Sequence, residues 1–169
     1  ESFLDVAGSL NVCLEFGLQT IHPAEGRAVR RQNNLEHVAR ALAGVRHRGI
    51  DHEVSLIFGL PGQTVDSFHA AVQWCLERRV PVIKAFPLLL LRGTGLVLEG
   101  DRWGFVDDGT PMPMVIASNS FTRQDWAGMS RLSEALRRTE GRHPSSLSEL
   151  LDLSEEAPPD LAQWQATAA

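Results

Sequence analysis

The sequence predicts an α/β fold in which parallel strands alternate with helices. Two observations support this prediction. Apolar runs of strand length begin near Val12, Glu53 and Val82, and segments with the apolar spacing of a helix separate them. Strands that are joined through helices by short connections run parallel, with right-handed crossovers. The expected architecture is an open α/β sheet or a piece of a β/α barrel.

The clearest strand pattern runs from Glu53 to Phe58 and stops in the turn Gly59-Leu60-Pro61-Gly62. A short apolar run between turn-forming residues is typical of a strand that is covered on both faces. In α/β sheets and in β/α barrels, ligands bind at the loops that leave the carboxyl ends of the strands. The loop from Gly59 to Thr64 is therefore the first candidate for a functional site.

The first strand is expected from Val12 to Gln19, with Gly17 inside it. A glycine within a strand usually marks a place that another group approaches closely. One or two helical turns are predicted between Ala24 and Arg31. After them, Asn34 is expected to cap a helix that ends at Gly49.

The second helix is predicted to begin at the cap residue Thr64, with an apolar face from Phe68 to Leu76. The third strand follows from Val82 and ends near Phe86, because Pro87 has no N–H to donate to a neighbouring strand. This completes the order strand, helix, strand, helix, strand.

The later part of the chain has a different character. Gly100 to Pro113 is rich in Gly, Asp and Pro and is predicted to be a long surface loop, followed by an extended piece at Val115 to Ala117. Thr122 with Asp125 is expected to cap a helix that runs to about Thr139. A further short helix is indicated by a capping pattern, Ser146 with Glu149.

Composition and charge limit the classes of function. With 43% hydrophobic and 22% charged residues, the chain resembles an ordinary globular domain. It has neither an apolar run of the ~20 residues that span a bilayer nor a signal-peptide pattern, so we expect no membrane partner and a cytoplasmic location. The net charge of −5 argues against a nucleic-acid partner held through phosphates. Cys13 and Cys75 are predicted to be buried free thiols, and the scattered histidines argue against a zinc site.

Several motifs together resemble a known family. These are Glu15 to Thr20, Arg31, Ser55 to Thr64, Lys84 to Leu88 and Arg92 to Thr94. In order and spacing they resemble the later half of the core of radical S-adenosylmethionine (SAM) enzymes. The resemblance covers about residues 10–96 and continues more loosely to about residue 138. It implies that the three strands are the fourth, fifth and sixth of a partial six-stranded β/α barrel.

This resemblance gives a division of the chain. Residues 1–96 would be the carboxyl-terminal half of the barrel core, and residues 97–121 a long loop with a short extended piece. Residues 122–153 would form the carboxyl-terminal helices, and residues 154–169 a disordered tail.

The resemblance also assigns cofactor-binding residues. It implies that Gln19 and Arg31 contact the ribose and carboxylate side of SAM, and that Ile57 packs on the adenine while Gly59 leaves space for it. An amide suits ribose hydroxyls, and a guanidinium suits a carboxylate. Ser55 stands where some relatives carry an aspartate, so a hydroxyl would replace a charged contact to the nucleoside. The sequence identifies no catalytic residue.

The family binds a [4Fe-4S] cluster through a CxxxCxxC motif after its first strand, and this chain has only Cys13 and Cys75. The cluster ligands are therefore expected in an amino-terminal half of the core that precedes this chain, which makes that half a partner. The parent enzyme would cleave SAM reductively to give a 5′-deoxyadenosyl radical, which would act on a small-molecule or unknown substrate. This chain alone is expected to be inactive.

A different class of function stays open from the residues alone. The chain could be a non-catalytic relative that keeps the α/β fold and binds a nucleotide or a partner chain. In that case Gln19 is a polar strand end, and Arg31 is one solvated charge of the run Arg27, Arg30 and Arg31. Lys84 either faces the inside of the barrel or extends to the surface.

Overall fold

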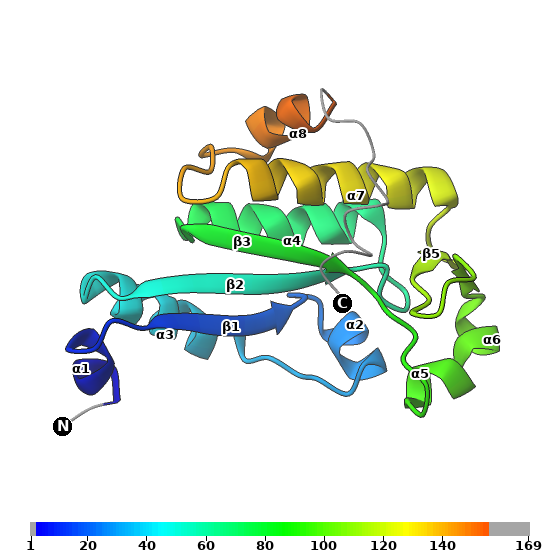
Figure 1. Cartoon of the computed structure of the whole chain (residues 1–169), viewed down its shortest axis with the longest axis horizontal. Coiled ribbons are helices and arrows are strands. Elements are labelled where there is room, and N and C mark those ends of the chain that lie inside the picture. The colour runs from blue at the N-terminus through cyan, green and yellow to red at the C-terminus, as the bar shows by residue number, and fades with distance from the viewer. Residues whose placement is uncertain (1–2, 156–169) are drawn as a thin grey trace.

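A parallel sheet of three strands forms the centre of the molecule (Figure 1). The strands are β1 (Cys13–Gln19), β2 (Asp51–Phe58) and β3 (Val82–Pro87), in the order β1-β2-β3. This computed structural model describes residues 3–155. The predicted α/β class, with parallel strands that alternate with helices, is confirmed.

Two long helices connect the strands, and both begin where the sequence predicts. α3 (Leu35–His47) joins β1 to β2, and the Asn34 side chain caps it by accepting from the His37 N–H at 3.0 Å. α4 (Val65–Glu77) joins β2 to β3 behind a capping box, in which Thr64 and Ser67 satisfy each other's backbone N–H groups. Gly49 follows α3 with a φ of +66°, the left-handed conformation that glycine adopts readily.

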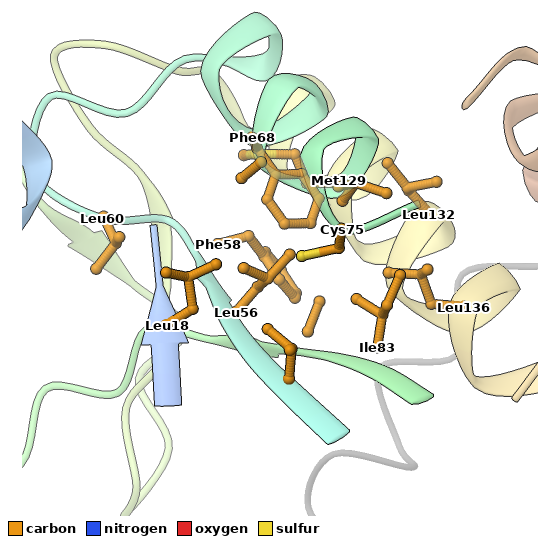
Figure 2. Close-up of a cluster of buried hydrophobic side chains, with 14 of the residues drawn as sticks. Leu18, Leu56, Phe58, Leu60, Phe68, Cys75, Ile83, Met129, Leu132 and Leu136 are labelled. Carbon is orange, nitrogen blue, oxygen red and sulfur yellow. The ribbon is translucent and has the colours of Figure 1, made fainter. Parts of the chain in front are cut away.

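The main hydrophobic core lies between one face of the sheet and the helices α4 and α7 (Arg123–Arg138). Figure 2 shows large side chains from the three strands meeting those of the helices. The fully buried members include Leu18, Leu56, Phe58, Leu60, Ile83, Phe68, Cys75, Met129, Leu132 and Leu136. The apolar face predicted for α4, from Phe68 to Leu76, is confirmed.

The carboxyl-terminal helices extend this layer. α7 starts with the predicted capping box of Thr122 and Asp125. α8 (Leu147–Glu155) packs on α7, and the Ser146 hydroxyl accepts from the Glu149 N–H at 3.3 Å. The predicted disordered tail began at residue 154, but Ser154 is buried in the last turn of α8. The rest of that predicted tail, residues 156–169, lies outside the described residues.

The smaller elements lie around the two ends of the sheet. α1 (Phe3–Gly8) packs on a second apolar cluster near the start of β1, and α2 (Pro23–Ala28) follows the end of β1. α5 (Gly95–Leu98) and α6 (Gly100–Trp103) follow β3 (Figure 1).

The segment from Gly100 to Pro113 is more ordered than the predicted long loop. Besides α6 it contains β4 (Val106–Asp107), which pairs antiparallel with β5 (Val115–Ala117). The Val115 N–H donates to the Leu88 carbonyl at 2.9 Å, which fastens this hairpin to the chain beyond β3. The extended piece predicted at β5 is confirmed. The sequence did not predict α6 and β4, because the Gly, Asp and Pro residues of this segment are typical of a loop.

The two cysteines lie in different environments. Cys75 is buried in α4, where desolvation raises the pKa of its thiol to about 12. Cys13 is exposed at the start of β1, so the prediction of two buried thiols is wrong for this residue. Its side chain points to the face of the sheet opposite the core. Within residues 3–155, no helix combines the length and the apolar character that crossing a bilayer would need.

His143 fastens the connection between α7 and α8 to β3. Its Nε2 accepts from the Ile83 N–H at 3.0 Å, so the ring is neutral and carries its proton on Nδ1. Nδ1 lies 2.8 Å from the Thr139 hydroxyl oxygen, which itself donates to the Ala135 carbonyl at 2.8 Å and can therefore accept. Burial of the ring lowers the pKa of His143 to about 4.

We expect His143 to make folding stability depend on pH. The unfolded chain takes up this proton near pH 6.5, whereas the folded chain does so only near pH 4. The contribution of neutral His143 to the free energy of unfolding is therefore complete above pH 6.5 and is lost as the pH falls toward 4. With allowance for solvent around the half-buried ring, the loss is about 2 kcal/mol.

Urea unfolding of the wild type and of His143→Gln between pH 7 and pH 4.5 measures this effect. The difference in unfolding free energy between the two proteins should shrink as the pH falls. The exposed His47 provides the matched control, His47→Gln, which should follow the wild type. A constant difference between the wild type and His143→Gln would contradict the expectation.

Candidate functional site

One face of the sheet carries polar and charged side chains instead of a core. Because side chains alternate along a strand, the residues paired across the sheet share a face. We call this the open face; it comprises Glu15, Gly17, Glu53, Ser55, Ile57, Lys84 and Phe86. The Lys84 ammonium lies 2.7 Å from the Glu53 carboxylate, and this contact raises the pKa of Lys84. Lys84 therefore lies on the face that would line a barrel.

Gln19 and Arg31 meet above Gly17 at the carboxyl end of β1. A Cβ atom on Gly17 would lie 3.0 Å from the Nη2 atom of Arg31 and 3.7 Å from the Nε2 atom of Gln19. Gly17 thus makes room for the Arg31 guanidinium, which agrees with the close approach predicted there. Gln19 has a φ of +62° and lies where the β1–β2 register shifts. Such backbone strain in a residue other than glycine is common at functional sites.

The chain after α2 turns sharply to bring Arg31 back to β1. The Arg31 N–H donates to the Gly26 carbonyl at 2.7 Å, and a Cβ on Gly26 would collide with the Arg31 carbonyl oxygen. Two residues later, the Asn33 side chain donates to the Leu18 carbonyl at 2.6 Å. This turn depends on a glycine because the two backbone segments touch.

The remaining predicted residues lie on or next to β2. Ser55 is opposite Gly17 in the sheet, and its hydroxyl donates to the Glu15 carboxylate at 2.6 Å. Ile57 is half-buried nearer the carboxyl end of the same strand, opposite Phe86. The structure therefore gathers Gln19, Arg31, Ser55 and Ile57 at one region of the open face.

Gly59 has a different setting from the one expected. Its φ is +88°, and the position of its missing Cβ lies 3.3 Å from the Val115 carbonyl oxygen. The space beside Gly59 is therefore filled by β5. The sequence resemblance implied instead that the adenine of SAM would lie there. Packing of β5 against this loop explains the need for glycine here.

Sequence reasoning missed a buried polar network behind the candidate site. Glu25 of α2 is 4% exposed, and its carboxylate accepts from the hydroxyls of Thr20 and Ser67, each at 2.5 Å. The Gln63 amide also approaches it, at 3.4 Å. These contacts join the end of β1 to the start of α4. A glutamate in a short helical turn is normally solvated, so nothing in the sequence marks Glu25 as buried.

Gln63 holds the loop after β2 in shape. It is fully buried, and its Oε1 accepts from the N–H groups of Gly59 and Leu60 at 2.7 and 3.2 Å. Its Nε2 donates to the Ile57 carbonyl at 3.1 Å. The loop that follows Ile57 is therefore rigid. The only sequence signal for this role was the position of Gln63 directly after the turn Gly59-Leu60-Pro61-Gly62.

The side chains at this site suit SAM but not an iron–sulfur cluster. Gln19 and Arg31 offer donors for ribose oxygens and a carboxylate, and Ile57 offers an apolar surface. A [4Fe-4S] cluster needs several cysteine thiolates, whereas of the two cysteines here only Cys13 is exposed, and Cys75 is buried in α4. Within the described part of the chain, no group of at least three His, Cys, Asp or Glu side chains is arranged to hold a metal.

Comparison with known proteins gives structural matches only. No protein-family model matches the chain, and no curated protein does. TsrM from Kitasatospora setae, a radical SAM methyltransferase solved with tryptophan and the SAM analogue aza-SAM, matches with a TM-score of 0.61 over 99% of this chain. The chain shares the fold of a radical SAM protein. Sequence identity over this match is 15%.

Two other solved structures also match the chain. Elp3 from the archaeon Methanocaldococcus infernus matches with a TM-score of 0.60 over 92% of the chain, at 16% identity. Coproporphyrinogen III oxidase (HemN) from Escherichia coli, a radical SAM enzyme, is 28% identical over 51% of the chain, but its TM-score of 0.45 carries no weight. The chain spans 43% of TsrM, 39% of Elp3 and 21% of HemN.

Proposed function

We propose that this chain is the later half of a radical SAM core and forms part of the SAM-binding site. The observation that carries the proposal is the meeting of the Gln19 amide and the Arg31 guanidinium above Gly17. These two groups lie at the carboxyl end of a parallel strand, where α/β folds bind ligands. Arg31 would pair with the SAM carboxylate, and Gln19 would bind the ribose hydroxyls.

Ile57 and Ser55 complete this half of the site. Ile57 offers an apolar contact for the adenine, and the rigid loop that Gln63 holds fixes its position. Ser55 contributes a hydroxyl beside Gly17, where it also contacts Glu15. In the complete core, SAM and a [4Fe-4S] cluster supply a 5′-deoxyadenosyl radical, and this chain's part is to bind and orient the nucleoside.

The cluster ligands belong to the amino-terminal half of the core, which we propose as a partner of this chain. Among residues 3–155, β1 is at the edge of the sheet and pairs with β2 only. An edge strand offers unpaired N–H and C=O groups to a further strand. The amino-terminal half would add its last strand there and place its cysteines near the open face.

Substitution of Arg31 and Gln19 tests the binding role. In the core assembled with its amino-terminal half and an intact cluster, Arg31→Ala should weaken SAM binding about 10- to 100-fold, because a charged hydrogen-bonding contact is lost. Gln19→Ala should weaken it about fivefold. Anaerobic calorimetry measures the affinities, and thermal unfolding of the unliganded protein measures stability.

Arg40→Ala is the matched control, because Arg40 is exposed on α3. It should leave both SAM affinity and melting temperature unchanged. Unchanged affinity together with a large loss of stability in Arg31→Ala and Gln19→Ala would assign both residues to the fold and favour a non-catalytic relative.

A further inference from the structure

A cavity of about 360 Å³ lies between the α2 region and the segment that contains α5 and α6. Its charged and aromatic lining residues are Arg27, Arg30, Glu99, Arg102 and Trp103, which we call the basic pocket. α2 follows β1 and α5 follows β3, so the basic pocket is at the carboxyl end of the sheet (Figure 1). It is therefore on the same end of the sheet as Gln19 and Arg31.

Positive charge exceeds negative charge in the basic pocket. Arg27, Arg30 and Arg102 face a single carboxylate, that of Glu99. Glu99 lies 3.9 Å from Arg30 and 3.8 Å from Arg102, and both distances exceed those of a charged hydrogen bond. The guanidinium groups thus keep most of their capacity to donate. This concentration of positive charge is notable because the whole chain has a net charge of −5.

Trp103 forms a wall of the basic pocket that neighbouring residues hold in place, whereas the side chains of Arg30 and Arg102 are exposed. The Trp103 ring lies 4.0 Å from the position of a Cβ on Gly62, and the Trp103 carbonyl accepts from the Asn119 N–H at 3.0 Å. The side chains of Arg30 and Arg102 are 84% and 71% exposed. They can close on a ligand without any movement of the wall.

The basic pocket is lined mainly by hydrogen-bond donors. Three guanidinium groups offer donors, and among the described residues that line the pocket only Glu99 has a carboxylate. The pocket therefore suits a ligand that consists of acceptors.

We propose that the basic pocket binds an anionic group, a phosphate or a carboxylate, of the substrate. Guanidinium groups bind both through paired hydrogen bonds. That the anion belongs to the substrate rests on the proposed function, because the pocket is at the same end of the sheet as the proposed SAM site. The binding of an anion does not depend on it.

Calorimetric titration of the 169-residue chain with sodium pyrophosphate and, separately, with citrate tests the proposal at low salt. We expect binding of at least one anion. Arg30→Gln and Arg102→Gln should each weaken it about fivefold, and added salt should weaken it further. Glu99→Gln should instead tighten it about threefold, because a competing carboxylate is removed.

Arg123→Gln is the matched control, since Arg123 is exposed at the start of α7 and makes the same change in charge outside the basic pocket. It should bind like the wild type, and circular dichroism should show that every variant is folded. Binding of pyrophosphate alone identifies a phosphate ligand, binding of citrate alone a carboxylate ligand, and binding of both a general anion site.

The proposal is overturned if neither anion binds at millimolar concentration. It is equally overturned if Arg123→Gln weakens binding as much as Arg30→Gln and Arg102→Gln do, or if Glu99→Gln weakens it. The titration needs neither SAM nor a cluster. Its failure is therefore distinguishable from loss of SAM binding in Arg31→Ala.

Discussion

Replacing Phe58 with alanine is expected to lower the free energy of unfolding by about 4 kcal/mol. Phe58 is fully buried, and its ring lies 5.7 Å from the rings of both Phe68 and Trp126. It therefore joins the sheet to α4 and to α7 at once (Figure 2). Removal of the Phe58 ring would leave a cavity between the sheet and both helices. Neither α4 nor α7 can move to fill it without losing contacts with the other helix. Thermal unfolding should show a melting temperature about 12 °C lower.

Phe3→Ala is the control for this change, because Phe3 is 72% exposed in α1. Its melting temperature should differ from that of the wild type by no more than about 2 °C. A loss in Phe58→Ala as small as that in Phe3→Ala would show that the sheet and the helices do not share one core.

Replacing Gly26 with alanine is expected to displace Arg31. The added Cβ would collide with the Arg31 carbonyl oxygen, and because that atom belongs to the backbone, the whole turn must open. We expect the unfolding free energy to fall by about 2 kcal/mol. In the complete core, SAM affinity should fall at least about tenfold, because the guanidinium leaves its place above Gly17.

Gly128→Ala in α7 provides the opposite expectation. Among the described residues, a Cβ at Gly128 meets only the Arg131 guanidinium, at 3.9 Å, so the variant should gain about 0.5 to 1 kcal/mol of stability. Its SAM affinity should not change. Equal stability and equal affinity of Gly26→Ala and the wild type would show that the turn does not position Arg31.

Local chemistry explains why so much of the fold could be predicted. Asn34, Thr64 and Thr122 all cap the helices they were expected to cap, because capping depends on the side chain and a few neighbouring N–H groups. The close approach at Gly17 was also predictable, because a glycine weakens a strand and is usually found there only where another group needs the room. These signals need no knowledge of distant parts of the chain.

Features that depend on distant contacts could not be predicted. Glu25 is buried because hydroxyls from β1's end and from α4 reach it, and neither neighbour is visible from its own sequence context. Cys13 is exposed because no helix within residues 3–155 covers the open face, whereas its apolar neighbours in the sequence indicated burial. Gly59 allows β5 to pack closely against the loop after β2, and β5 lies more than fifty residues further along the chain.

The one-sided core has a consequence for how a barrel of this kind is assembled. All the large fully buried side chains of β2 point toward the helices, while the open face of the same strand carries Glu53, Ser55 and Ile57. A further strand at the edge of β1 would add main-chain hydrogen bonds without merging two apolar interiors. Such a pairing of edge strands through main-chain hydrogen bonds depends little on which side chains the strands carry. If this chain is the later half of a barrel, as proposed, the two halves could diverge in sequence separately, each keeping its own interior, and still join at the same edge.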